Sequence, residues 1–157
     1  MNLNEQIIDV WRYLAANNVN YLTIGGFAVN IYGYGRNTGD IDIFIEDTII
    51  NRENLREALK QLGIGNFESI NTMQFIPGWT DFTLNFNFRL DIMTSVKGLE
   101  NTSFKALLEK ANIIDIDGIP VYFLDYESLI ISKKAANRLK DQLDIEELEK
   151  LNNRNLD

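Results

Sequence analysis

The spacing of apolar residues changes twice near the start of the chain. Apolar side chains first recur every three or four positions, which predicts an amphipathic helix over residues 3–17. A short apolar run then predicts a strand at residues 21–24, followed by two glycines and a short helix at 27–33. Residues 40–47, DIDIFIED, alternate acidic and apolar side chains, so we expect a second strand with its isoleucines on one face.

The middle of the chain is predicted to form one helix followed by strands. Residues 51–63 have a capped helical pattern, with Asn51 as the N-cap and Gly63 as the stop. Residues 67–93 are rich in aromatic and β-branched side chains and predict two or three strands. The run FRLDIM, at 88–93, is the clearest of them.

The remainder of the chain predicts a helix, a hairpin and a helical end. A helix is expected near residues 103–112, and Asp117-Gly118 between apolar runs is typical of a hairpin turn. Asp125 is placed to cap a final helical region. Together the elements predict the α/β (α+β) class, a mixed β-sheet with helices packed on it and a short helical C-terminal part.

Length and composition support one globular domain. The chain has 157 residues, of which 45% are hydrophobic, enough for one hydrophobic core. We expect a single domain over residues 1–157, with a core over about residues 1–98 and a C-terminal hairpin and helical part over about residues 99–157.

Several classes of chemistry and partner are excluded by composition. The chain has no cysteine and no histidine, which excludes thiol nucleophiles, imidazole catalysis and metals held by these residues. Its net charge of −8 argues against general nucleic-acid binding, and only the tract 133–140 is locally basic. The first residues include acids and no long apolar block, so we expect no membrane segment and a cytoplasmic protein.

Two aspartates in the second strand indicate a cation. Asp40 and Asp42 stand two residues apart on a strand, so they point to the same side with Cα atoms about 6.5 Å apart. Two such charges repel each other unless a cation or proton intervenes, and Mg²⁺ favours carboxylates together with substrate phosphates. Gly25 and Gly26, between the first strand and a helix, would let backbone N–H groups approach a phosphate.

The order of these motifs resembles a known superfamily. A strand, Gly-Gly, thirteen residues and Asp-Ile-Asp on a second strand are similar to the signature of the DNA polymerase β-like nucleotidyltransferases. The runs IGGFAVNIYGYGRNTGDIDIFI, LDIMTSVKG and LDYESLIISKKAANRLKDQLDIEEL resemble a branch of small bacterial nucleotidyltransferase-like proteins of unknown function. The Gly-Gly to Asp-x-Asp region is also similar to lincosamide nucleotidyltransferases and AbiEii-type toxins. The resemblance implies a minimal nucleotidyltransferase fold.

The resemblance also implies a metal site built from three carboxylates. Asp40 and Asp42 would bind two Mg²⁺ ions about 3.5–4 Å apart, with Mn²⁺ as an alternative. Asp91, in the run FRLDIM, would complete the site and could accept the proton of the attacking hydroxyl. All three are therefore candidate catalytic residues as well as metal ligands.

Five other residues are candidates for binding the nucleotide. The resemblance places the triphosphate at Gly25 and Gly26, with Arg36 as the nearest cation unless it is a solvated loop arginine. Thr38 is expected to shape the loop or to contact substrate. Lys133 interrupts the buried face of the last helical region and needs an anionic partner, either the nucleotide phosphates or a structural acid, unless its ammonium group snorkels to solvent. On the same helical region, Arg138 and Asp141 are spaced for a surface ion pair.

Three functions are compatible with these features. The first is an enzyme of the EC 2.7.7 type that moves a nucleoside monophosphate from an NTP, with ATP the expected donor, to a hydroxyl of a small molecule or protein. The second is a toxin–antitoxin or phage-defence module that acts on a partner protein. The third is a nucleotide-binding protein without turnover.

Two departures from the superfamily pattern affect the acceptor. The glycine pair is Gly-Gly rather than Gly-Ser, so a hydroxyl that many members offer to a phosphate is absent. We also expect the C-terminal part to be too short for the full acceptor-binding domain of antibiotic-modifying relatives. An antibiotic acceptor would then require a second subunit, so a homodimer is an alternative to the monomer.

Overall fold

The computed structural model describes residues 4–84 and 88–156. Its strands form one six-stranded mixed sheet in the order β3-β4-β2-β1-β6-β5. The strands are β1 (Tyr21–Ile24), β2 (Asp40–Ile45), β3 (Asp81–Thr83), β4 (Arg89–Met93), β5 (Asn112–Ile116) and β6 (Ile119–Phe123). The helices are α1 (Glu5–Ala16), α2 (Gly25–Ile31), α3 (Ile49–Gln61), α4 (Phe104–Glu109), α5 (Tyr126–Ala136) and α6 (Leu139–Arg154), with a 3₁₀ turn at Glu68–Asn71.

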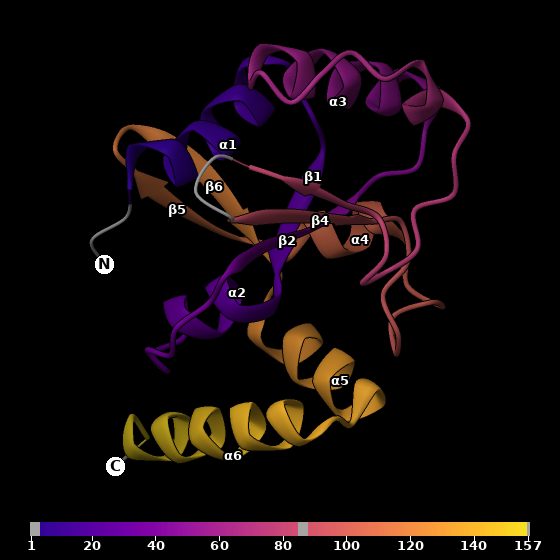
Figure 1. Cartoon of the computed structure of the whole chain (residues 1–157). Coiled ribbons are helices and arrows are strands. Elements are labelled where there is room, and N and C mark those ends of the chain that lie inside the picture. Colours follow the sequence, from indigo (N-terminus) through magenta and orange to yellow (C-terminus); the bar gives the residue numbers. More distant parts are fainter. Residues whose placement is uncertain (1–3, 85–87, 157) are drawn as a thin grey trace.

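Helices flank the sheet, and α1 contacts α2 through Trp11 and Phe27. Figure 1 shows α1 and α3 above the sheet, and α2, α5 and α6 below it. The C-terminal hairpin of β5 and β6 belongs to the same sheet, because β6 pairs in parallel with β1. No helix within residues 4–84 and 88–156 is long and apolar enough to cross a membrane.

Strand register brings two distant aspartates together. β1 runs antiparallel to β2 with Ile24 opposite Asp42, and β2 runs parallel to β4 with Asp42 opposite Asp91. Side chains at paired positions share one face of a sheet. The ends of three neighbouring strands therefore present both carboxylates beside the turn at Gly25.

The core is built around one tryptophan. Trp11, on α1, is fully buried and packs edge-on against Phe27 and near Phe123. Its indole N–H donates to the hydroxyl of Thr23, on β1, at 3.0 Å. This hydrogen bond satisfies a polar group inside the core and ties α1 to the strand that ends at Gly25.

The predicted helix starts differ from the observed ones. The helix expected at 27–33 begins two residues earlier, at Gly25 itself. The N-cap of α3 is Thr48 rather than Asn51, and the Thr48 side chain accepts a hydrogen bond from the Asn51 backbone N–H. Asn51 is buried instead, where its side chain bonds the backbone of Asn20 and Glu46. The helix at 3–17 is observed as α1, although Leu3 lies outside the described residues.

The C-terminal elements follow the prediction except for one break. The hairpin turns at Asp117 and Gly118, both with positive φ, and Asp125 caps α5 through the backbone N–H of Ser128. The final helical region is two helices, because Asn137 adopts a left-handed conformation with φ of 52° and ends α5. In the described part of residues 67–93, the predicted strands are β3 and β4.

The Trp11–Thr23 hydrogen bond can be tested by substitution. Thr23→Val keeps the side-chain shape but leaves a buried donor without a partner, so we expect the free energy of unfolding to fall by about 1–3 kcal/mol. Denaturation followed by Trp11 fluorescence measures this in a Trp79→Phe background, because Trp79 is 83% exposed and would obscure the signal. Thr23→Ser keeps the hydroxyl and should lose less; a greater loss in serine than in valine contradicts the assignment.

Candidate active site

All eight residues predicted from the sequence to form the site line one cleft. The cleft has a volume of about 570 Å³ and lies between the ends of β1, β2 and β4 and the helices α5 and α6. This volume is within the usual range for small-molecule sites. Sequence separation among the eight residues is large, so their convergence comes from the sheet pairing and from the fold of the C-terminal helices.

The three aspartates lie on one face of β2 and β4, where their charges disfavour one another. Asp42 is opposite Asp91, and Asp40 precedes Asp42 by two positions on the same face. Burial raises the pKa of Asp42 to about 7, and the neighbouring charges of Asp91 and Asp40 contribute. Burial also raises the pKa of Asp91. The site therefore holds at least one carboxyl group that a cation would stabilise in its charged form.

Asp91 is held by a loop that the sequence did not indicate as part of the site. The backbone N–H of Gly78 donates to Asp91 Oδ2 at 3.1 Å, and Pro77 and Gly78 line the cleft. Asp91 is only 8% exposed, and its Oδ1 is buried with no hydrogen-bond partner among the described residues. In the sequence, Pro77-Gly78 is a signal for a break between strands and does not by itself indicate a binding site.

The donor set suits a hard cation only in part. Carboxylate oxygens are the ligands that Mg²⁺ prefers, and the unpaired Oδ1 of Asp91 is such an oxygen. Within residues 4–84 and 88–156, however, no group of three or more acidic side chains is arranged to hold a metal ion. Mg²⁺ usually takes one or two carboxylates and completes its shell with water and substrate phosphates. The residues fit that mode of binding.

The two glycines make room for side chains of the site. Gly25 has a φ of 67°, and a Cβ there would lie 2.1 Å from Asp42 Oδ2. A Cβ at Gly26 would lie 2.6 Å from the Thr38 hydroxyl, which itself donates to the backbone carbonyl of Asp40 at 3.1 Å. Glycine is thus required here for close packing of Asp42 and Thr38. Of the two roles predicted for Thr38, shaping the loop and contacting substrate, this hydrogen bond to the backbone of Asp40 corresponds to the first.

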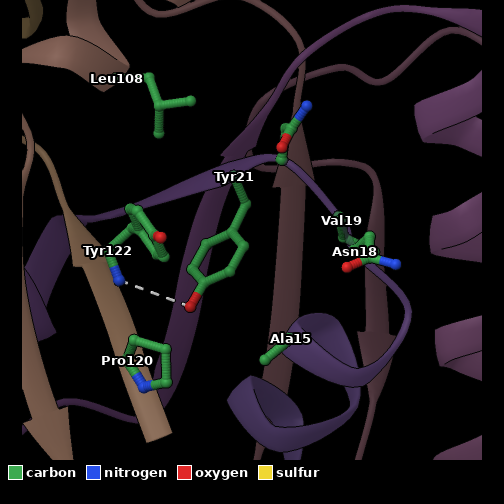
Figure 2. Close-up of a pocket in the computed structure, with 8 residues that line it drawn as sticks. Ala15, Asn18, Val19, Tyr21, Leu108, Pro120 and Tyr122 are labelled. Atoms are coloured by element: carbon green, nitrogen blue, oxygen red, sulfur yellow. Dashed lines mark hydrogen bonds between the residues drawn. The ribbon is translucent and has the colours of Figure 1, made fainter.

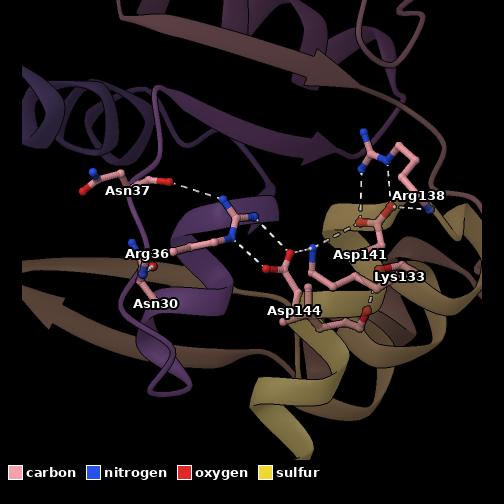
Figure 3. Close-up of polar contacts among 9 residues, drawn as sticks. Asn30, Arg36, Asn37, Lys133, Arg138, Asp141 and Asp144 are labelled. Carbon is pink, nitrogen blue, oxygen red and sulfur yellow. Dashed lines mark hydrogen bonds and ion pairs between the residues drawn. The ribbon is translucent and has the colours of Figure 1, made fainter.

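The two predicted cations are paired with acids of α6. Figure 3 shows Arg36 and Lys133 reaching Asp144, and Lys133 and Arg138 reaching Asp141. Lys133 therefore has the structural acid that was one of its two predicted partners. The predicted Arg138–Asp141 pair exists, but only its arginine lies at the surface: the Arg138 side chain is 61% exposed, whereas Asp141 is 1% exposed and also neighbours Lys133.

Asp141 is held in its charged form by the cations of this cluster. Burial would raise the pKa of Asp141, but the hydrogen bonds from Arg138 and the charge of Lys133 bring it below its ordinary value. Asp144, 1% exposed, was not predicted as a site residue. In the sequence it is one acid among several in a polar helix, and nothing local distinguishes it.

Two further lysines line the cleft and were not singled out from the sequence. Lys97 follows β4, and Lys140 lies at the start of α6. Neither forms an ion pair with a described residue, and the charge of Lys140 lowers the pKa of Asp42. Lys140 lies in the tract 133–140 whose basic character was evident in the sequence, whereas Lys97 had no such signal.

A second cavity lies away from these residues. It has a volume of about 230 Å³ and is lined by Tyr21, Tyr122 and six uncharged neighbours. Figure 2 shows the two tyrosines meeting there, with the Tyr122 backbone N–H donating to the Tyr21 hydroxyl. None of the predicted site residues lines it, so the candidate chemistry is confined to the larger cleft.

Comparisons with known proteins concern both family and fold. The sequence model of a family described as "Nucleotidyl transferase of unknown function (DUF2204)" matches residues 3–157. No curated protein matches the chain.

Several solved structures are similar in fold. Lincosamide antibiotic adenylyltransferase LnuA, lincomycin-bound, is similar with a TM-score of 0.60 and 12% identity, over 95% of this chain and 98% of that one. ANT(2″)-Ia in complex with adenylyl-2″-tobramycin has a TM-score of 0.59 and 17% identity, over 94% and 92%. An antigenic nucleotidyltransferase-like protein from Paracoccidioides brasiliensis has a TM-score of 0.57 and 16% identity, over 93% and 74%.

The fold is thus a minimal nucleotidyltransferase fold, as predicted. The expectation that the C-terminal part is too short for an antibiotic-modifying relative is wrong in the case of LnuA, since the chain covers 98% of that protein. The helices α5 and α6 form one wall of the cleft. A second subunit is not needed to match that relative in length.

The glycine requirement at position 25 leads to a prediction. We expect Gly25→Ala to lower the free energy of unfolding by more than about 1–3 kcal/mol, because the positive φ is costly for alanine and the new Cβ would also collide with Asp42. Thermal unfolding measures the effect. Gly35→Ala is the matched control, because a Cβ at Gly35 meets nothing within 4 Å. Equal destabilisation of the two variants would contradict the close packing of Asp42.

The raised pKa of Asp42 leads to a prediction about pH. A carboxyl group whose pKa is raised on folding favours the folded state below its unfolded pKa of about 4, and this contribution is lost as pH rises through about 7. Asp42→Asn cannot ionise, so its stability relative to wild type should increase between about pH 5.5 and about pH 8.5.

The measurement is the difference in unfolding free energy between wild type and Asp42→Asn at the two pH values, with divalent ions removed by EDTA. Asp117→Asn, in the hairpin turn outside the cleft, is the control. A difference for Asp42→Asn that stays constant with pH would show that the carboxyl group does not change its charge in this range.

Proposed function

The chain belongs to the DUF2204 family of nucleotidyl transferases, and on that premise we propose that it moves a nucleoside monophosphate from an NTP to a hydroxyl group and releases pyrophosphate. The observation that carries the proposal is the pairing of Asp42 with Asp91 at the floor of the cleft, beside Gly25. The buried carboxyl group of Asp91 and the partly buried one of Asp42 both have a raised pKa, and Asp91 has an unpaired oxygen, which favours a cation between protein and phosphate.

Asp42 and Asp91 would hold the metal, with Asp40 as a further ligand on the same face. When bound, Mg²⁺ or Mn²⁺ would screen the phosphate oxygens and stabilise the charge of the leaving group. The Gly78 N–H holds Asp91 Oδ2 and leaves Oδ1 for the ligand or for a proton.

In the proposed reaction the acceptor oxygen attacks the α-phosphorus. A new oxygen–phosphorus bond forms, the bond from the α-phosphorus to the bridging oxygen of the β-phosphate breaks, and pyrophosphate leaves. Asp91 takes the proton of the attacking hydroxyl, which its raised pKa favours. Gly25 and Gly26 provide the surface on which the phosphates lie.

The cationic side chains that line the cleft would stabilise the negative charge of the leaving group. Lys140 and Lys97 have no ion-pair partner among the described residues, so their ammonium groups are available to an anion without breaking a protein contact. Arg138 is 61% exposed at its side chain and keeps donors beyond those bound to Asp141. We place the β- and γ-phosphates on this side of the cleft.

The proposed donor is ATP and the proposed acceptor is a small molecule. Structures similar in fold include a lincosamide antibiotic adenylyltransferase with bound lincomycin and ANT(2″)-Ia in complex with adenylyl-2″-tobramycin, so each of these proteins was solved with a small molecule rather than a protein as its ligand. The cleft of about 570 Å³ has the size for such a ligand beside a nucleotide phosphate group. A protein acceptor in a toxin–antitoxin pair, or nucleotide binding without turnover, would be distinguished by the experiment below.

We expect Mg²⁺ and ATP together to stabilise the wild type. A ligand at about a hundred times its Kd adds about 2.7 kcal/mol, enough to raise the melting temperature by several degrees in a domain of this size. Thermal unfolding with ATP, GTP, CTP and UTP, each with and without Mg²⁺, is the measurement, accompanied by an assay of pyrophosphate release with pooled small-molecule acceptors.

Asp42→Asn should lose the shift that requires Mg²⁺, whereas Asp117→Asn should keep it. Metal-dependent binding with no pyrophosphate release in the presence of small acceptors would favour a protein acceptor or a binding protein. Absence of any nucleotide shift in the wild type would contradict the proposed function.

A further inference from the structure

Asp144 connects the C-terminal helix to the loop between the glycines and the first aspartates. It lies on α6, 108 residues from Arg36 in sequence, and it is 1% exposed. Arg36 Nε donates to Asp144 Oδ1 at 2.7 Å and Arg36 Nη2 donates to Asp144 Oδ2 at 3.0 Å, a two-point contact visible in Figure 3. A bidentate pair of this kind fixes the plane of the guanidinium group as well as its position.

This contact leaves one nitrogen of Arg36 facing the glycines. Arg36 Nη1 has only a long hydrogen bond, 3.4 Å, to the Asn37 carbonyl. It lies 3.3 Å from the place where a Cβ of Gly26 would be. Because Nε and Nη2 are occupied by Asp144, Nη1 is the part of the guanidinium group that can donate to an anion over Gly25 and Gly26.

The same carboxylate holds Lys133. Lys133 Nζ lies 2.9 Å from Asp144 Oδ2 and 3.5 Å from Asp141 Oδ1, and its side chain is 6% exposed. The cluster consists of three cations and two anions: Arg36, Lys133 and Arg138 with Asp141 and Asp144. The two acids thus keep three cations together at the wall of the cleft, with one positive charge in excess.

We propose that Asp144 is a positioning residue that directs Arg36 Nη1 at the polyphosphate of the nucleotide bound over Gly25 and Gly26. The inference rests on the proposed function for the identity of the anion. Asp144 itself makes no contact with the ligand; it acts through Arg36 and, on the same side, through Lys133. The helix α6 is then part of the nucleotide site, although Asp144 on it acts only through the side chains that it orients.

The opposite role, in which Asp144 competes with the nucleotide for Arg36, is disfavoured by burial. Release of Arg36 and Lys133 would leave a carboxylate that is 1% exposed without its partners, which is costly. Competition also predicts the opposite result on mutation. Loss of Asp144 would strengthen nucleotide binding under competition and weaken it under positioning.

The test is a double-mutant cycle on binding of ATP with Mg²⁺, measured by isothermal titration calorimetry well below the melting temperature of each variant. We expect Asp144→Asn to weaken binding by about tenfold or more, the usual effect of losing a hydrogen bond to a charged group. Arg36→Lys keeps the charge but lacks the two-point geometry and should weaken binding to a similar extent. The double variant should bind no worse than the weaker-binding single variant, because both changes remove the same interaction, the hydrogen bond donated by the oriented Arg36 Nη1.

Glu149→Gln is the matched control. It removes the exposed Lys134–Glu149 pair, which also joins α5 to α6, and it should leave the affinity for ATP unchanged. A merely structural role of Asp144 would lower the melting temperature without the coupling to Arg36. If Asp144→Asn does not fold, Arg36→Lys and Asp144→Glu test the geometry, and each should lose affinity while keeping the cluster charged.

Unchanged or tighter binding by the folded Asp144 variants, or effects that multiply in the double variant, would overturn the inference and leave the proposed function intact. If the wild type binds ATP with the expected coupling but transfers no nucleotide, the proposed function fails and the inference about Asp144 stands. If the wild type binds no ATP at all, both fail.

Discussion

The pairing of β2 with β4 places Asp42 opposite Asp91, and the site depends on this unfavourable proximity. Burial raises the pKa of both groups, so the apo protein does not easily hold two negative charges there. Asp42 also lies so close to Gly25 that no side chain fits between them. The sheet therefore builds a local excess of negative charge that a cation can relieve, and this is the physical basis of the proposed metal and nucleotide chemistry.

The C-terminal helices place positively charged side chains on the other wall of the cleft. Lys140 and Lys133 both lower the pKa of Asp42, and each belongs to the helical part rather than to the sheet. The acids Asp141 and Asp144 prevent the same wall from becoming an unpaired cluster of cations. Opposite charges thus line opposite walls, and the space between them suits a ligand that combines a metal ion with phosphates.

Much of the fold was predictable because the relevant signals are local. Alternation in DIDIFI predicts a strand with Asp40 and Asp42 on one face, and Asp117-Gly118 predicts a hairpin turn. The errors occurred where local signals compete. Thr48 and Asn51 are both good caps, and Asn51 was unavailable because it bonds the backbone of Asn20 and Glu46. The break at Asn137 depends on a left-handed residue inside a region that is otherwise favourable for helix.

The sequence by itself determined the strands, the carboxylates and their shared face, since periodicity and residue type suffice for these. Only the tertiary structure decided which groups surround them. The Gly78 N–H on Asp91 and the Asp144 contact with Arg36 join residues that are 13 and 108 positions apart in the sequence. No spacing rule covers such distances, because each contact depends on how the helices and loops pack on the sheet. The carboxylates were therefore evident in advance, whereas the residues that position their partners were not.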